Sequence, residues 1–236
     1  MTKEHIVKAY DEELAELDQM VSDMVAAVRE QISQSVVNIS KYEKGGLQKS
    51  IDFDETIDDM QVDIDNHATR MLALRQPVAA DLRKIVVSFR ISNDLERIGD
   101  YAKNVAKRLD VLVDMDLPEE AGFSITRMGR MVNRMLDDAL KAYLNGDKQL
   151  ALDVIEADEN VDHAHTAFFR EVMTYMMEDA KYITACTHFM FITKNIERMG
   201  DHVTNMAEQV YYVVTGEHIK EGRVNKDKSI NVSAEL

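Results

Sequence analysis

Apolar residues recur every three or four positions along most of this chain, which is the period of an amphipathic α-helix. The first such stripe begins at Tyr10 and continues in these steps to Ile39, without the alternation of a β-strand. The pattern predicts helices at about 4–44, 47–76, 78–113, 123–144, 148–178 and 183–214. The predicted fold class is therefore all-α, with six long helices.

Residues that break helices are scarce, and they fall between the predicted helices. The chain has 9 Gly and 2 Pro among 236 residues. Pro77 and Pro118 lie at predicted breaks, since proline disfavours helical geometry at the residue before it. Glycine commonly ends a helix, and glycines follow the first, fourth and sixth stripes: Gly45-Gly46, Gly146 and Gly216.

The chain consists of two similar halves, which indicates a duplication. The segment DLERIGD, from Asp94 to Asp100, is matched by NIERMGD, from Asn195 to Asp201. Other corresponding positions are also separated by about 100 to 104 residues. We therefore predict two tandem, symmetry-related three-helix bundles, at residues 1–116 and 117–216, followed by a polar C-terminal tail at 217–236.

Composition narrows the classes of function. Apolar residues make up 45% of the chain, enough for a substantial core, and the formal net charge of -15 argues against nucleic acid as a partner. Cys186 is the one cysteine, which favours a reducing compartment. The N-terminus has no apolar signal region, and no apolar run approaches the ~18 residues of a membrane span. We expect a cytoplasmic protein that meets a membrane only through its partners.

Each half carries two pairs of acidic residues at helical spacing. Members of a pair are four residues apart, so both lie on one face of a helix. Like charges at this spacing destabilise an isolated helix by about 0.2–0.5 kcal/mol, and a bound cation would offset the repulsion. The candidate metal ligands are Asp54 and Asp58, Glu96 and Asp100, Asp158 and Asp162, and Glu197 and Asp201.

A helical wheel, at about 100° per residue, places all four pairs away from the apolar stripes. The pairs of the third and sixth helices lie roughly 160° from their stripes, and the two Asp pairs lie roughly 90–100° away, on a flank. This predicts a metal site on the bundle surface with hard oxygen ligands. Di-iron carboxylate bundles differ, because their ligands project inward and include Glu-x-x-His motifs. The alternative is that the acids are solvated or are paired with Arg97 and Arg198.

A row of arginines follows the third predicted helix. Arg83, Arg90 and Arg97 recur every seven residues and so lie on one side of that helix. The second half does not repeat them. They either pair with neighbouring acids or form a docking edge for an acidic partner.

Four segments of the chain resemble the family of the phosphate-transport-system regulatory protein PhoU. They are RQPVAADLR (Arg75–Arg83), DLERIGDYAKNVA (Asp94–Ala106), TYMMED (Thr174–Asp179) and NIERMGDHVTNMAE (Asn195–Glu208). The resemblance covers almost the whole chain. It implies a fold of two symmetry-related three-helix bundles. It also implies a negative regulator of phosphate uptake that links the phosphate ABC transporter to the sensor histidine kinase of the phosphate regulon, without enzymatic activity.

The same resemblance implies multinuclear metal clusters of iron or zinc at the eight acidic positions named above. Manganese and magnesium suit the same oxygen ligands. We expect a homodimeric regulatory adaptor that acts by protein–protein contact. One alternative is a metalloenzyme with a carboxylate-bound cluster, although no nucleophile or evident base accompanies the acidic pairs. Another is a structural helical protein without metal.

Overall fold

The computed structural model describes residues 3–36, 48, 53–115, 117 and 121–219, with side chains from Tyr10 onward. Within these ranges no residue is in a β-strand, and a short 3-10 turn, η2 (Ala180–Tyr182), joins the last two helices. The prediction of an all-α fold is confirmed. The long helices, in chain order, are α1 (Lys3–Ser35), α3 (Asp54–Arg75), α4 (Ala79–Leu112), α5 (Ala121–Asn145), α6 (Lys148–Glu178) and α7 (Ile183–Thr215).

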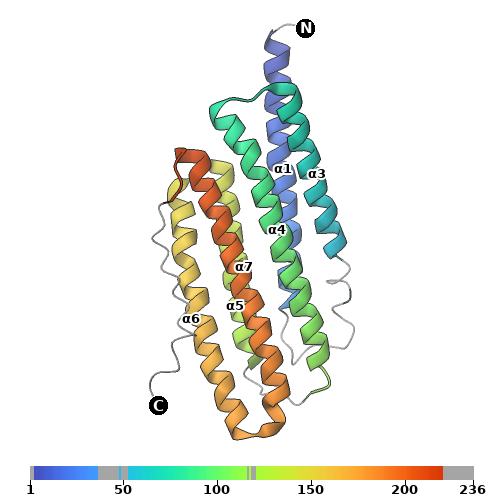
Figure 1. Ribbon diagram of the computed structural model, residues 1–236, viewed down its shortest axis with the longest axis vertical. Helices are drawn as coiled ribbons and strands as arrows, with labels where there is room; N and C mark the ends of the chain where they lie inside the picture. Colours follow the sequence, from blue (N-terminus) through green and yellow to red (C-terminus); the bar gives the residue numbers. More distant parts are fainter. Residues whose placement is uncertain (1–2, 37–47, 49–52, 116, 118–120, 220–236) are drawn as a thin grey trace.

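The helices form two bundles that lie side by side along the long axis of the molecule (Figure 1). α1, α3 and α4 pack together, and α5, α6 and α7 pack together. The bundles meet mainly through α4 and α7, and α1 also contacts α5. α4 and α7 are therefore central helices with neighbours on several sides. None of the helices in the described ranges has the length and hydropathy of a membrane span.

The helix ends follow the local chain chemistry expected from the sequence. Gly216 ends α7 with φ of 76°, and its N–H donates to the Tyr212 carbonyl over 2.8 Å. Gln76, which precedes a proline, ends α3 in the left-handed region with φ of 48°. The side chain of Asp147 caps α6 by accepting from two backbone N–H groups at 3.0 Å. Residues 37–47, 49–52, 116, 118–120 and 220–236 lie outside the description. The predicted first glycine break, the break at Pro118 and most of the predicted tail fall there.

A hydrophobic core runs through both bundles, and it buries most of the predicted apolar stripes within the described ranges. α4 and α7 also bury a second stripe, made of small and hydroxyl side chains. In α4 this stripe includes Ser88, Ser92, Gly99, Ala102 and Ala106, and in α7 it includes Thr193, Gly200, Thr204 and Ala207. Small residues let the neighbouring helices approach closely. The buried side of each central helix is therefore wider than its large apolar residues alone indicate.

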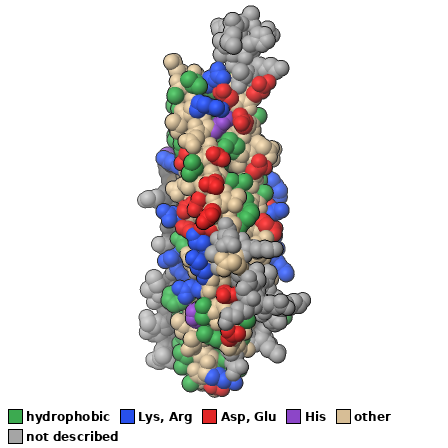
Figure 2. Space-filling model, turned by 90° about the vertical axis from the view of Figure 1, so that its right-hand side faces the viewer, with side chains coloured by type: hydrophobic (Ala, Val, Ile, Leu, Met, Phe, Trp, Pro, Cys, Tyr) green, Lys and Arg blue, Asp and Glu red, His purple; other side chains and the backbone are tan. Residues whose placement is uncertain are grey.

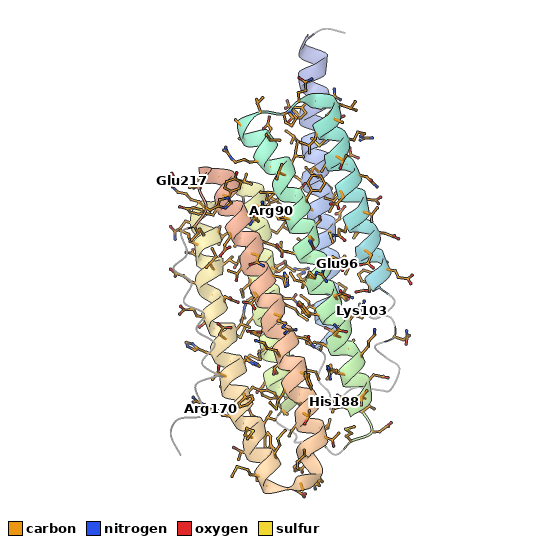
Figure 3. All side chains as sticks on the ribbon, in the orientation of Figure 1. Arg90, Glu96, Lys103, Arg170, His188 and Glu217 are labelled. Atoms are coloured by element: carbon orange, nitrogen blue, oxygen red, sulfur yellow. The ribbon has the colours of Figure 1, made fainter. Side chains whose placement is uncertain are left out.

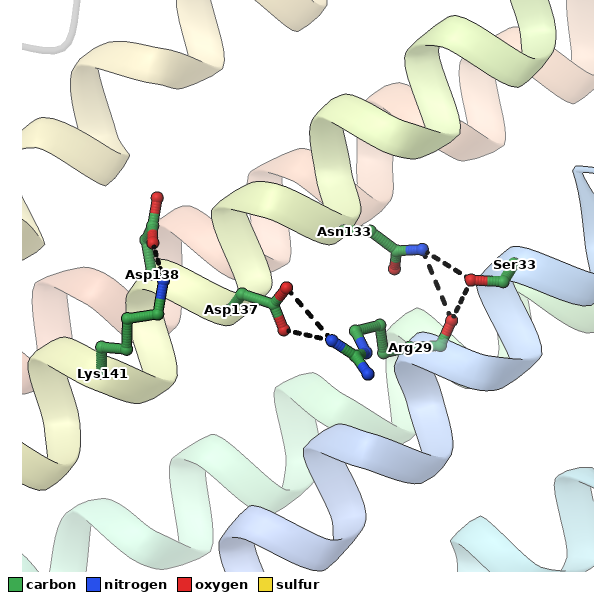
Figure 4. Close-up of polar contacts among 6 residues, drawn as sticks. All are labelled: Arg29, Ser33, Asn133, Asp137, Asp138 and Lys141. Carbon is green, nitrogen blue, oxygen red and sulfur yellow. Dashed lines mark hydrogen bonds and ion pairs between the residues drawn. The ribbon is translucent and has the colours of Figure 1, made fainter.

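α1 and α5 are joined by polar contacts at the boundary between the bundles (Figure 4). The Arg29 guanidinium lies 3.0 Å from a carboxylate oxygen of Asp137. Asn133 donates its side-chain amide to the Ser33 hydroxyl over 2.9 Å. Both contacts are exposed, so each adds little to stability.

The arginine row of α4 lies against α7. Arg83 donates to the Val213 carbonyl over 3.4 Å, and Arg90 donates to the side chain of Gln209 over 2.9 Å (Arg90 is labelled in Figure 3). Among the described residues, Arg97 is the one member of the row that forms an ion pair, at 3.6 Å from Glu96. Two of the three arginines therefore hold the bundles together, which neither sequence-based interpretation foresaw.

Candidate functional site

The eight predicted ligands gather at two helix–helix contacts, one in each bundle. Lys103 of α4 contacts Asp54 of α3 and Asp100 of its own helix. Asp158 of α6 lies against Gly200 of α7, the residue before Asp201. We call the first group the N-terminal acidic cluster: Asp54, Asp58, Glu96 and Asp100. We call the second group the C-terminal acidic cluster: Asp158, Asp162, Glu197 and Asp201.

In the N-terminal acidic cluster, a lysine lies between the two helices. The Lys103 ammonium donates to Asp100 Oδ1 over 2.7 Å and also to Asp54 Oδ2 on the facing helix. Figure 3 shows Lys103 on α4 below Glu96. Burial favours the neutral amine, but the two carboxylates outweigh it and raise the pKa of Lys103 above its ordinary value. The cluster therefore contains an internal cation.

Lys103 does not neutralise all the charge of its cluster. Burial, followed by the charge of Asp54, raises the pKa of Asp58. Burial, followed by the charge of Asp100, raises the pKa of Glu96. Both carboxyl groups therefore still favour a bound proton or cation.

In the C-terminal acidic cluster, a glutamate is buried without full compensation. The Glu197 residue is 6% exposed, and its Oε1 accepts from Lys194 Nζ over 2.8 Å, one turn earlier on the same helix. Its Oε2 is buried and accepts no hydrogen bond from any described residue. Burial raises the pKa of Glu197, and Asp201 and Asp162 raise it further against the effect of Lys194.

Glycine brings α6 and α7 together at this cluster. A Cβ added to Gly200 would lie 2.8 Å from Asp158 Oδ1, closer than real Cβ contacts allow. Gly200 therefore makes room for an α6 carboxyl group against the backbone of α7. A Cβ added to Gly99, its counterpart in α4, would instead lie 3.1 Å from the amide oxygen of Gln31.

The outward placement predicted by the helical wheel is wrong for three of the eight residues. Asp54, Asp158 and Glu197 are only 7%, 6% and 6% exposed. The wheel was centred on the apolar stripes, and so it missed that α7 also buries a second side, on which Glu197 lies with Thr193 and Gly200. Asp54 and Asp158 lie on the flanks of their helices, where they are covered by the neighbouring helix.

The two clusters fit a metal ion differently. Carboxylate oxygens suit hard cations, and the uncompensated Glu197 Oε2 gives the C-terminal acidic cluster an open acceptor. In the N-terminal acidic cluster, Lys103 already bridges the helices. As arranged, no group of three or more His, Cys, Asp or Glu side chains in the described ranges is placed to hold an ion. The eight residues stay predicted ligands that are near one another but not assembled around a centre.

Sequence reasoning missed the two lysines of these clusters. Lys103 lies three residues after Asp100, and Lys194 lies three residues before Glu197, so each shares a helix face with its acid. That spacing could have indicated the two ion pairs from the sequence. The lysines do not correspond in the duplication, however, since Lys103 matches Thr204 at an offset of 101 residues. A search for repeated motifs passes over them for this reason.

His202 also lies beside the C-terminal acidic cluster. Its Nδ1 is 2.8 Å from Asp94 Oδ1 on α4, and its ring lies 5.7 Å from that of Tyr101. The histidine therefore belongs to the contact between the bundles, as a hydrogen-bonding residue.

Both bundles resemble a known protein family. A model of the PhoU domain matches the chain twice, at residues 21–109 and 125–210. The chain belongs to the PhoU family. A relative from Caulobacter vibrioides, named phosphate-specific transport system accessory protein PhoU homolog, is 43% identical over 224 residues, covering 95% of this chain and 97% of the relative. A Rhizobium meliloti relative of the same name is 39% identical, covering 92% and 91%.

Solved structures of PhoU proteins share the fold. PhoU from Pseudomonas aeruginosa superposes with a TM-score of 0.83 at 34% identity, covering 88% of this chain and 100% of that one. The phosphate transport system regulatory protein PhoU from Streptococcus pneumoniae gives 0.82 at 30% identity, covering 89% and 99%. The resemblance stated from the sequence motifs is therefore confirmed.

Proposed function

We propose that this protein is an accessory regulator of phosphate transport that restrains uptake when phosphate is plentiful. One observation carries the proposal: both bundles match the PhoU domain, and relatives that match nearly the whole chain are named accessory proteins of the phosphate-specific transport system. Those names describe accessory proteins and not enzymes, which favours a regulator without catalytic activity.

The regulatory role is tested by phosphate uptake in cells that lack the protein. In excess phosphate, such cells should take up labelled phosphate faster than the parent strain, and the restored gene should return uptake to the parental rate. Unchanged uptake in cells proven to lack the protein would contradict the proposal.

At finer detail, we propose a cytoplasmic adaptor between the phosphate ABC transporter and the sensor histidine kinase. An adaptor needs separate surfaces with different chemistry. Figure 2 shows the side of the molecule on which α3 lies, where Asp and Glu side chains gather along the middle. The exposed acids of α3 include Glu55, Asp58, Asp59 and Asp63. This side suits a basic protein surface.

The adaptor hypothesis is tested with the purified transporter ATPase subunit and the purified cytoplasmic part of the kinase. We expect each to bind the protein, and the joint reversal of Asp59 and Asp63 to lysine to weaken one of the two interactions. Binding of neither component would reject the adaptor role while leaving the uptake result intact.

We also propose that the acidic clusters take up metal ions, with iron or zinc as the first candidates and manganese or magnesium as further ones. The uncompensated Glu197 carboxylate and the raised pKa values of Asp58 and Glu96 support this, since a cation relieves all three. Elemental analysis of the purified protein, with and without chelator, tests it.

The same preparations separate the alternatives. Turnover of a phosphate ester or of peroxide by the metal-loaded protein would favour a metalloenzyme. Absence of metal from these preparations, together with a stability that added metal does not change, would favour a purely structural helical protein.

A further inference from the structure

A groove runs between α5 and α6 on the outside of the C-terminal bundle. Its volume is about 450 Å³. The floor is apolar and consists largely of Met131, Met135, Leu150 and Val154. Methionine side chains are flexible and polarizable, so such a floor adapts to apolar side chains of different shape.

The groove carries two arginines that have no partner in the described residues. Arg127 and Arg134 line it and are exposed, and neither forms an ion pair, hydrogen bond or ring contact within the described ranges. They are seven residues apart on α5, or about 10 Å along one side of the helix. Two guanidinium groups therefore remain available to an anionic partner.

Two acids line the groove, and one of them is neutralised by a lysine. Asp138 accepts from Lys141 over 2.7 Å, as Figure 4 shows. Asp153 accepts from the side-chain amide of Gln149 over 2.9 Å. A neutral amide leaves the charge of Asp153 in place, so the two unpaired arginines of the lining face one carboxylate without a cation. The groove is therefore positive by one charge, in a chain whose formal net charge is -15.

The duplication shows that the fold does not require these arginines. Buried positions of α1 and α5 correspond at an offset of 104 residues, as in Val21 with Ile125 and Val28 with Val132 (125 − 21 = 132 − 28 = 104). At the same offset, Arg127 corresponds to Asp23 and Arg134 corresponds to Glu30. Both counterparts are exposed acids. The same two helical positions thus carry opposite charge in the two bundles, which points to a surface-specific use in the second bundle.

From these observations we propose that the α5–α6 groove docks an amphipathic helical segment of a protein partner. The apolar face of the segment packs on the methionine floor, and acidic side chains on its flanks pair with Arg127 and Arg134. The inference goes beyond the regulatory role, because it assigns a surface and the chemistry of its occupant. It is independent of the acidic clusters and of any metal.

The experiment uses the full chain and two synthetic peptides of about 18 residues, labelled for fluorescence anisotropy. Both present leucines at i, i+3, i+4 and i+7. One has glutamates on the flanks of this stripe, and the other has lysines. We expect the glutamate peptide to bind at least about tenfold more tightly than the lysine peptide, a difference within the range of close interfacial charge pairs.

Three variants make the test specific. Arg127→Glu and Arg134→Glu should each weaken binding of the glutamate peptide, and the double variant should reverse the preference in favour of the lysine peptide. Arg130→Glu is the matched control, because Arg130 is exposed on α5 but does not line the groove. Met131→Gln should weaken the binding of both peptides, because it makes the floor polar.

Circular dichroism should show equal helicity for all the variants. Equal binding of the two peptides, or an equal effect of Arg130→Glu, would overturn the proposal. Sedimentation of the full chain provides a further check. If the wild type self-associates and the double arginine variant does not, the groove binds a second copy of the chain, and the proposed partner segment is wrong.

Discussion

The two acidic clusters share a sequence pattern but differ in how their charge is balanced. In the N-terminal acidic cluster, Lys103 of α4 reaches across to Asp54 of α3. In the C-terminal acidic cluster, Lys194 pairs with Glu197 on its own helix, and nothing described donates to the second oxygen of that glutamate. In the first cluster the compensating lysine joins two helices. In the second cluster a buried carboxylate is only half compensated.

This difference shows that duplicated carboxylates need not keep duplicated roles. A lysine between helices acts as a built-in cation, so the N-terminal acidic cluster gains less from an added ion. A buried and incompletely compensated carboxylate gains more, because desolvation without a partner is costly. We therefore expect the C-terminal acidic cluster to bind metal more tightly.

Lys103→Met should remove the internal cation of the N-terminal acidic cluster. We expect the free energy of unfolding to fall by about 2 kcal/mol, less than for a fully buried pair because Lys103 and Asp100 are partly exposed. Urea unfolding in chelator measures the change. Lys107→Met, an exposed change one turn further along α4, is the control. If both variants lose the same stability, the bridge contributes nothing.

Replacing one acid in each cluster should show which site holds metal more strongly. Asp201→Asn should lower metal affinity by at least roughly tenfold, the loss usual when a metal site is disturbed. Asp100→Asn should lower it less, because Lys103 already competes for that carboxylate. Calorimetric titration with zinc or manganese measures both. A larger loss in Asp100→Asn would reverse the proposed order of the clusters.

Glu197→Gln should stabilise the metal-free protein at neutral pH. The pKa of Glu197 is raised in the fold. Protonation of Glu197 therefore stabilises the fold fully below its ordinary pKa of 4.5, and this stabilisation is lost as the pH rises through the raised pKa. The neutral glutamine avoids that loss, and we expect a gain of about 1 kcal/mol at pH 7. Below pH 4.5 the two proteins should converge.

Urea unfolding in chelator across this pH range gives the comparison, and Glu156→Gln provides an exposed control on α6. A stability difference that is independent of pH would show that ionisation of Glu197 is not its cause.

The two equivalent glycines should respond differently to alanine. Gly200→Ala forces Asp158 to move, and we expect a loss of about 1 kcal/mol after the gain in helix propensity. Gly99→Ala meets the side chains of Gln31 and Ile57 at 3.1 and 3.3 Å, and we expect a change within about 0.5 kcal/mol. Thermal unfolding measures both, and weaker metal binding should accompany Gly200→Ala alone.

The sequence predicted most of the fold because its signals are local. The 148–178 helix was predicted at the bounds that α6 has, and Gly216 marked the end of α7, since periodicity and a helix-ending glycine act over a few residues. The burial of Asp54, Asp158 and Glu197 was not predicted, because it depends on which helices cover their flanks. The partners of Arg83 and Arg90 lie more than a hundred residues away on α7, and no helical wheel could find them.

By itself the sequence determined an all-α chain of two related halves, the spacing of the acidic pairs and the family to which the motifs belong. These follow from residue order, because helical periodicity and repeated segments are properties of the chain alone. Only the tertiary structure decided that α4 and α7 are central, that Lys103 joins two helices, and that Glu197 is buried with one oxygen uncompensated. Those features arise where distant helices meet, and there the environment of a charged side chain is set by its neighbours in space.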